Sequence, residues 1–77
     1  MGDFHLRLKE IRKNIKVTQK QAALNMGIAE NQYQSYELGR SKPSYEIIIK
    51  LCQYFNISAD YLLGLSNNPT PLRKNAP

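Results

Sequence analysis

Five short polar side chains lie close together between residues 30 and 35 of the chain. They are Glu30, Asn31, Gln32, Gln34 and Ser35. No Lys or Arg stands among them, although the whole chain carries a formal net charge of +5. An amide donates and accepts hydrogen bonds, a carboxylate only accepts them, and a hydroxyl does either. This combination favours selective hydrogen bonding to a partner, whereas a run of Lys and Arg would bind any phosphate surface.

A helix is the element that must position these side chains. Tyr33 and Tyr36 are three residues apart, and this spacing places both on the inward side of a helix. The side chains that then point outward are those of Glu30, Asn31, Gln34 and Ser35. Leu38 and Gly39 end this helix, and a loop with the sequence "RSKPS" follows it.

A second, shorter helix comes directly before the polar helix, within "VTQKQAALNMG". Thr18 and Gln21 have the spacing of a capping box, and Gly27 suits the left-handed residue that ends a helix. Only Ile28 and Ala29 separate Gly27 from the polar helix. Two helices joined by so short a turn, with polar residues on the second, form the arrangement in which a helix enters the major groove of DNA.

Three further helices, and no convincing strand, complete the pattern. The first spans about residues 4 to 15, with Asp3 as its N-cap and apolar residues at helical spacing as far as Ile15. The fourth follows a Ser44 cap over about residues 45 to 55, and the fifth is a short helix in "ADYLL". The sequence therefore predicts an all-α fold, a compact five-helix bundle.

Composition divides the chain near residue 65. Residues 1–65 carry the periodic pattern of one domain, and a length of 77 residues allows no more than one. Residues 66–77, "SNNPTPLRKNAP", contain three prolines and show no periodicity. We therefore expect a flexible tail after the domain.

Charge and hydropathy restrict the partner and the compartment. A pI near 9.6 favours an anionic partner, with nucleic acid ahead of membrane because no segment combines a basic face with a strongly apolar one. The longest apolar run, residues 47–49, is far shorter than the ~20 residues of a membrane span. The chain begins without a secretory signal, and its single Cys52 cannot form an internal disulfide. We expect a cytoplasmic protein.

Four segments together resemble a known family. In chain order they are "LKEIR", "TQKQAALNMGI", "YELGRSKPS" and "ISADYLLG". Their order and spacing resemble the Cro/CI-type (XRE) helix-turn-helix family of bacterial and phage transcriptional regulators, over about residues 6 to 64. The resemblance implies a lambda-repressor-like fold that binds double-stranded DNA sequence-specifically through its third helix. It implies no cofactor, no metal and no small-molecule substrate, and a repressor that is nucleoid-associated when bound.

The resemblance also implies roles for individual residues. Base reading is expected from Glu30, Asn31 and Ser35, with Gln32 and Gln34 as contributors. Phosphate contacts are expected around this face, from Gln19, Lys20, Arg40, Ser41, Lys42 and Tyr45. Arg12 and Glu37 match a partly buried ion pair that links the first helix to the third in this family.

The chain departs from the family pattern near the third helix. Ala29 stands where Ser or Thr usually caps that helix, a difference that should cost about 1 kcal/mol. Glu30 places a negative charge where phosphates would repel it. Ala22 stands where Leu is usual, and we expect Tyr33 to fill the space above it.

Members of this family commonly act as symmetric dimers on palindromic operators, with half-sites about one helical turn apart. Candidates for the dimer contact are the apolar residues Ile47, Ile49, Leu62, Leu63 and Leu65, some of which will be core. A protein-interaction module on the same fold, of the antitoxin or anti-repressor type, is the alternative to a DNA reader. Glu30 favours that alternative, whereas Gln19, Arg40 and Lys42 oppose it.

An enzyme is not expected from this sequence. His5 is the only histidine, and no carboxylate pair, nucleophile with a base, or metal-ligand cluster accompanies it. We interpret His5 as a surface residue.

Overall fold

The computed structural model describes residues 4–71 as five helices joined by short turns, with no strand among them. The helices are α1 (Phe4–Asn14), α2 (Gln19–Met26), α3 (Glu30–Glu37), α4 (Tyr45–Phe55) and α5 (Ala59–Leu62). The predicted all-α, five-helix fold is confirmed. The predicted Asp3 cap lies outside the described residues. Within the described part of the chain, no helix has the length and hydropathy to cross a membrane.

Local capping sets the bounds of α2, as the sequence predicts. The Gln21 backbone N–H donates to Thr18 Oγ1 at 3.0 Å, and the Thr18 N–H donates to Gln21 Oε1 at 2.8 Å. Gly27 ends the helix at φ 74°, in the left-handed region that glycine adopts without strain. Ile28 and Ala29 then lead directly into α3.

The first helix is shorter than its apolar spacing predicts. It ends at Asn14, Lys16 adopts a left-handed φ of 61°, and Ile15 is exposed. The reason is the turn itself, because it directs Val17 against the core, where the Val17 carbonyl accepts a hydrogen bond from Arg12 Nη1 at 2.9 Å. A longer α1 would carry Val17 past this position.

The core lies where α1, α2, α3 and α4 meet, and α5 closes one end of it. Its largest fully buried side chains are Tyr33, Leu8, Leu51 and Leu62. Ala22 and Tyr33 are both fully buried, and the expectation that Tyr33 occupies the space left by a small residue stays a prediction. Cys52 is also buried, and burial raises the pKa of its thiol.

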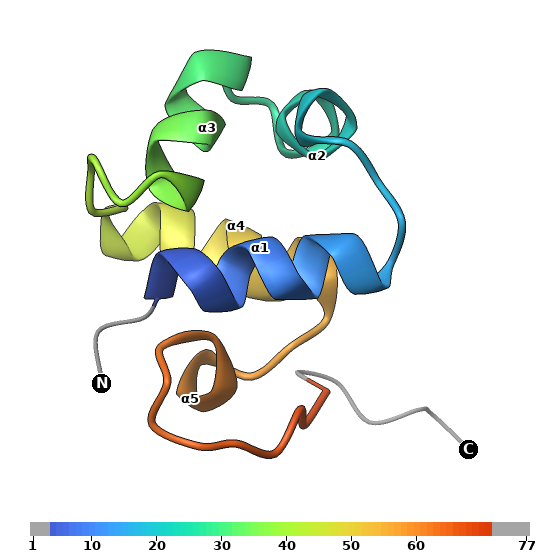
Figure 1. The fold of residues 1–77 in the computed structure, drawn as a ribbon, viewed down its shortest axis with the longest axis vertical. Helices are drawn as coiled ribbons and strands as arrows, with labels where there is room; N and C mark the ends of the chain where they lie inside the picture. The colour runs from blue at the N-terminus through green and yellow to red at the C-terminus, as the bar shows by residue number, and fades with distance from the viewer. Residues whose placement is uncertain (1–3, 72–77) are drawn as a thin grey trace.

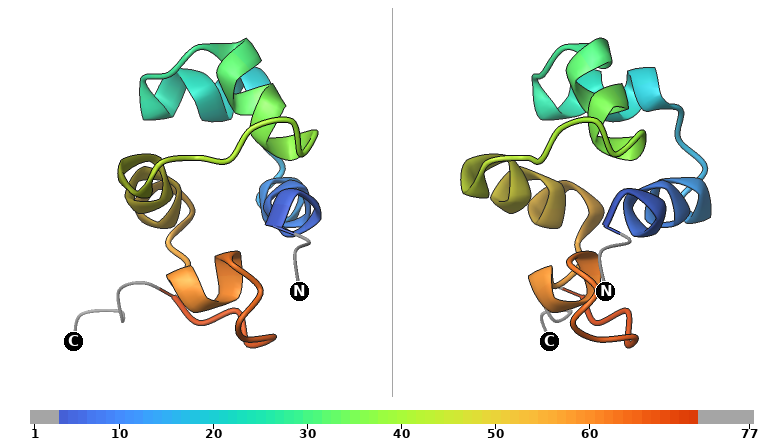
Figure 2. Two further views of the ribbon diagram at one scale, coloured as in Figure 1. Left: turned by 90° about the vertical axis from the view of Figure 1, so that its left-hand side faces the viewer. Right: turned by 60° about the vertical axis from the view of Figure 1, so that its left-hand side comes forward.

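The helices are arranged so that α3 lies at one end of the molecule. Figures 1 and 2 show α2 and α3 together at that end, α1 and α4 in the middle, and α5 at the opposite end. The loop between α3 and α4 begins at the end of α3 nearer the middle of the molecule and runs from there to α4 (Figures 1 and 2). This arrangement leaves the outer face of α3 open to a partner.

The segment after α5 folds back against the domain. Arg7 stacks over the Tyr61 ring at 4.1 Å and donates hydrogen bonds to the carbonyls of Tyr61 and Ser66, at 3.0 and 3.3 Å. The Ser58 N–H donates to the Thr70 carbonyl at 2.8 Å. Ser66, Asn67 and Thr70 are therefore hydrogen-bonded to the domain. The flexible tail expected over residues 66–77 stays a prediction, and residues 72–77 lie outside the described part.

The uncapped start of α3 yields a stability prediction. Ala29 makes no side-chain capping bond, and Gln32 does not replace it because its amide donates to Tyr36 Oη at 2.9 Å. Ala29→Ser should raise the free energy of unfolding by about 1 kcal/mol, since a hydroxyl would accept from an unpaired N–H of the first turn. The measurement is a higher urea midpoint at an unchanged slope.

The matched control is Ser44→Ala, which removes the cap that α4 possesses. It should lower the free energy of unfolding by a similar amount. Equal midpoints for Ala29→Ser and the wild type would contradict the prediction.

Candidate nucleic-acid interface

A buried carboxylate at the end of α3 joins three helices. Glu37 is 5% exposed. Its Oε2 accepts from Arg12 Nε at 2.7 Å and from Tyr33 Oη at 2.6 Å, while its Oε1 accepts from Arg12 Nη2 at 3.1 Å and from Gln19 Nε2 at 2.9 Å. The structure thus places Arg12 and Glu37 in a bidentate ion pair. Because Arg12 lies on α1 and Gln19 on α2, the network fixes the orientation of α3 relative to both.

The charge of Glu37 is maintained against its burial. Desolvation by itself would raise the pKa of this carboxyl, but the hydrogen bonds donated by Arg12, Tyr33 and Gln19 outweigh it and hold the pKa below its ordinary value. The hydrogen bonds that Arg12 donates to Glu37 raise the pKa of Arg12 in turn. Burial, followed by the contact with Glu37, raises the pKa of the Tyr33 phenol, so its hydroxyl stays a donor.

The outward face of α3 carries the five polar residues predicted for base reading. Glu30, Asn31 and Gln32 are exposed, and Gln34 and Ser35 are half-buried. Gln34 Nε2 donates to Glu30 Oε2 at 3.3 Å, and Ser35 Oγ donates to the Gln32 carbonyl at 2.6 Å. Among the described residues, the Asn31 side chain makes no hydrogen bond, so its whole amide is available to a partner.

Two side-chain hydrogen bonds on this face join residues one helical turn apart. Gln32 with Tyr36 and Glu30 with Gln34 are each four residues apart on the helix. Side chains at that spacing are neighbours on one helix face. The four-residue spacing that makes these hydrogen bonds possible is therefore visible in the sequence.

The loop after α3 returns to the polar face. The Arg40 N–H donates to the Ser35 carbonyl at 2.9 Å, and Ser41 Oγ donates to Ser35 Oγ at 2.8 Å. These bonds hold Arg40, Ser41 and Lys42, all exposed, beside the C-terminal end of α3. Two cationic side chains, Arg40 and Lys42, therefore lie at one end of a helix face whose other side chains are neutral apart from Glu30.

The other residues predicted for phosphate contact differ in their surroundings. Lys20 and Tyr45 are exposed at the first turns of α2 and α4. Gln19 is half-buried, and its amide donates to Glu37, which leaves one amide N–H for an outside acceptor. The side chain of Gln19 therefore belongs to the buried network as well as to the candidate interface.

His5 has a contact that the sequence did not indicate. A Cβ built on Gly39 would lie 3.3 Å from His5 Cγ, and Gly39 has a left-handed φ of 75°. The loop after α3 therefore packs on the His5 ring of α1 at a position where only glycine fits comfortably. His5 is therefore half-buried against the loop that carries Arg40 and Lys42, and it is not the surface residue that the sequence led us to expect.

The predicted dimer candidates separate into core and surface residues. Leu62 is fully buried, so its assignment to a dimer contact was wrong, and Ile47 is half-buried against the core. Ile49, Leu63 and Leu65 remain exposed. Leu62 turns inward because α5 is a single short turn that must close the core with it.

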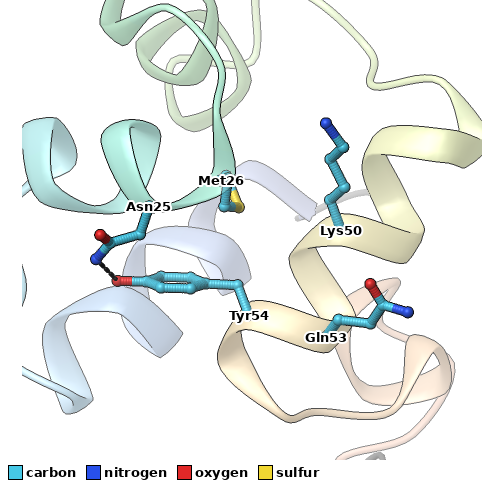
Figure 3. A pocket seen from close by; sticks show the side chains of 5 residues that line it. All are labelled: Asn25, Met26, Lys50, Gln53 and Tyr54. Carbon is cyan, nitrogen blue, oxygen red and sulfur yellow. Dashed lines mark hydrogen bonds between the residues drawn. The ribbon is translucent and has the colours of Figure 1, made fainter.

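A pocket of about 280 Å³ opens between α2 and α4, away from the polar face of α3 (Figure 3). It is lined by Asn25, Met26, Lys50, Gln53 and Tyr54. The Asn25 amide donates to Tyr54 Oη at 3.1 Å across one wall and so connects the end of α2 to α4. Over residues 4–71, no group of three or more His, Cys, Asp or Glu side chains could hold a metal ion.

The Glu37 network predicts a specific pH dependence. The folded carboxyl has the lower pKa, so its contribution to stability is present above about pH 4.5 and is lost as the pH falls through the folded pKa. Glu37→Gln should lower the free energy of unfolding by about 3 kcal/mol at neutral pH, since it leaves Arg12 without its counter-charge. Urea denaturation from about pH 7 to about pH 3 should show this difference shrinking.

The matched control is Glu46→Gln, which removes an exposed carboxylate from the first turn of α4. Its stability should stay close to that of the wild type at neutral pH. If the Glu37→Gln and wild-type curves ran parallel across the whole pH range, the network would not stabilise the fold as described.

Comparison with known proteins agrees with this geometry. A family model described as a helix-turn-helix domain matches residues 6–67. The chain is 39% identical over 65 residues to YobD of Bacillus subtilis, an uncharacterized HTH-type transcriptional regulator, covering 84% of this chain and 58% of that protein. It is 40% identical over 58 residues to RstR, a cryptic phage CTXphi transcriptional repressor of Vibrio cholerae, covering 75% and 52%.

A further relative carries a different description. The antitoxin PezA of Streptococcus pneumoniae is 39% identical over 57 residues, covering 74% of this chain and 36% of PezA. The chain thus spans about half the length, or less, of these curated relatives. No solved structure is significantly similar to it. The resemblance to the Cro/CI-type family is confirmed: the chain belongs to the helix-turn-helix family of transcriptional regulators, which are not enzymes.

Proposed function

We propose that this domain binds double-stranded DNA sequence-specifically, with α3 in the major groove, and that it represses transcription from the sites it occupies. The observation that carries the proposal is the outward polar face of α3, held in place by the Glu37 network and flanked by Arg40 and Lys42. The name of RstR as a transcriptional repressor supports the direction of regulation. Such a protein would act in the bacterial cytoplasm, at the nucleoid when bound.

Base reading belongs to the side chains on the outward face of α3. Asn31 has the free amide that a bidentate contact to adenine N6 and N7 requires. Glu30, Gln34 and Ser35 present acceptor atoms beside it. Gln32 contributes less, because its amide nitrogen is held by Tyr36.

Affinity for the DNA backbone comes from the surrounding residues. Arg40 and Lys42 supply positive charge, whereas Ser41, Tyr45 and the remaining N–H of Gln19 supply neutral donors. Lys20 adds a further charge at the start of α2. No cofactor is needed for this mode of binding.

We propose that the domain acts as a homodimer on a palindromic operator. Ile49, Leu63 and Leu65 are exposed apolar residues on α4 and after α5. Figure 1 shows α5 at the end of the molecule opposite α3, so a contact there would leave the polar face free. Two recognition helices in successive major grooves would then lie about 34 Å apart.

The similarity to an antitoxin favours a second function, the protein-interaction module on the same fold. Glu30 on the outward face is compatible with it, since a carboxylate is repelled by phosphate. The exposed basic residues of the loop after α3 favour the DNA reader.

Selection from randomised duplex DNA at about 150 mM salt tests the DNA-binding proposal. Wild-type protein should enrich an inverted repeat. Asn31→Ala should lose preference at one or two base positions per half-site, at about tenfold in affinity, and keep the salt dependence, because its amide contacts bases. Arg40→Ala should keep the base preference and reduce the slope of log affinity against log salt by about 0.9 per protomer.

Failure to enrich any sequence, together with weak retention on all duplexes, would contradict the DNA-binding proposal. Capture of a specific protein partner by the same preparation would then favour the interaction module.

The dimer proposal makes its own prediction. Leu65→Asp places a charge on an exposed apolar residue, so it should weaken cooperative binding to the inverted repeat at least tenfold and leave the fold intact. Sedimentation of the protein–DNA complex measures the number of protomers. Leu24→Asp, which makes the same change at an exposed apolar residue of α2, away from these three residues, is the matched control. A wild-type complex with a single protomer per inverted repeat would contradict the dimer.

A further inference from the structure

Three side chains on the outward face of α3 each use one hydrogen-bond donor within the protein, those of Gln32, Gln34 and Ser35. Gln34 Nε2 donates to Glu30 Oε2 at 3.3 Å. The Ser35 hydroxyl donates its proton to the Gln32 carbonyl at 2.6 Å and accepts from Ser41. The acceptor oxygens of Glu30 and Gln34 therefore remain on this face, beside one further N–H each on Gln32 and Gln34 and the whole amide of Asn31.

The strongest acceptor site is formed by Glu30 and Gln34 together. They lie one helical turn apart, with Glu30 exposed and Gln34 half-buried. Their mutual hydrogen bond orders two side chains that would otherwise be flexible, and it leaves Glu30 Oε1 and Gln34 Oε1 unpaired among the described residues. We call these two residues the acceptor pair.

We propose that the acceptor pair selects cytosine at one position of each half-site, by accepting a hydrogen bond from its N4 amino group. The inference rests on the proposed function, because it assumes that α3 enters the major groove. Beyond that function, it specifies cytosine as the preferred base and Glu30 as the side chain that determines the preference.

The pattern of base edges explains why cytosine is preferred over the other bases. In the major groove cytosine presents only the N4 donor, whereas adenine places the N7 acceptor beside its N6 donor. Guanine presents two acceptors, and thymine presents O4 and a methyl group. A carboxylate is repelled by N7, O6 and O4, so cytosine alone offers a donor with no neighbouring acceptor. The second N–H of Gln34 remains for guanine O6 in the same base pair.

The fold tolerates the negative charge of Glu30 at this position. Glu30 is the first residue of α3, whose N-terminal N–H groups have no side-chain cap at Ala29. A helix N-terminus stabilises a nearby anion. The net charge of +5 and the basic loop at the other end of α3 offset the repulsion by phosphate. An acidic residue that weakens general DNA affinity is useful there only if it discriminates between sequences.

Glu30→Gln tests the proposal, because an amide at the same position gains a donor. Wild-type protein should select an inverted repeat with a conserved cytosine, and changing that cytosine should weaken binding about tenfold. In the same selection, Glu30→Gln should prefer adenine at that position, since Gln bonds adenine N6 and N7. Gln34→Ala should reduce the preference for cytosine without creating one for adenine.

The matched control is Glu46→Gln, which makes the same charge change in the first turn of α4. This variant should bind all duplexes more tightly, and it should select the same DNA sequence as the wild-type protein. All three substituted residues are exposed or half-buried, and circular dichroism would check the fold of each variant.

The outcomes separate the inference from the proposed function. If the wild-type protein and Glu30→Gln select the same DNA sequence, the proposal of sequence-specific DNA binding is supported. The proposal that the acceptor pair selects cytosine is then overturned. The proposal for the acceptor pair is also overturned if the DNA sequence that the wild-type protein selects has no conserved cytosine. If no protein selects any sequence, the proposed function fails and the inference fails with it.

Discussion

The orientation of α3 depends on one buried carboxylate. Glu37 is held by four hydrogen bonds, from Arg12, Tyr33 and Gln19, and these connect α3 to α1 and α2. Removing a carboxylate from water is costly, so a buried ion pair contributes less to stability than to the choice of one geometry. Here the geometry is the angle at which α3 leaves the body of the domain. Any partner recognised by α3 is therefore recognised by a helix whose end cannot rotate freely.

The same network connects the core to the outer face. The Tyr33 ring is fully buried in the core and its hydroxyl donates to Glu37, so one side chain fills the core and supports the ion pair. Gln19 donates to Glu37 from the start of α2 and retains an N–H for the exterior. A substitution of Tyr33 or Gln19 would therefore alter the orientation of α3 as well as the local packing.

The two ends of the molecule suit different contacts. The end formed by α2 and α3 carries polar residues and the basic loop, whereas exposed Leu63 and Leu65 lie after α5 at the other end (Figures 1 and 2). Arg7 holds the segment after α5 on α1, through contacts with Tyr61 and Ser66. These contacts hold the start of the segment after α5 against α1.

The sequence by itself determined the helices and the inward side of α3. Thr18, Gln21 and Gly27 act on their immediate neighbours, and the tyrosine spacing is a property of one helix, so both could be predicted locally. Tertiary structure decided the end of α1 at Asn14, the position of the loop on His5, the burial of Leu62 and the hydrogen bonds of Arg7. Each of these joins segments far apart in the chain. Periodicity reports which face of an element is buried, but only the packed structure determines what that face meets.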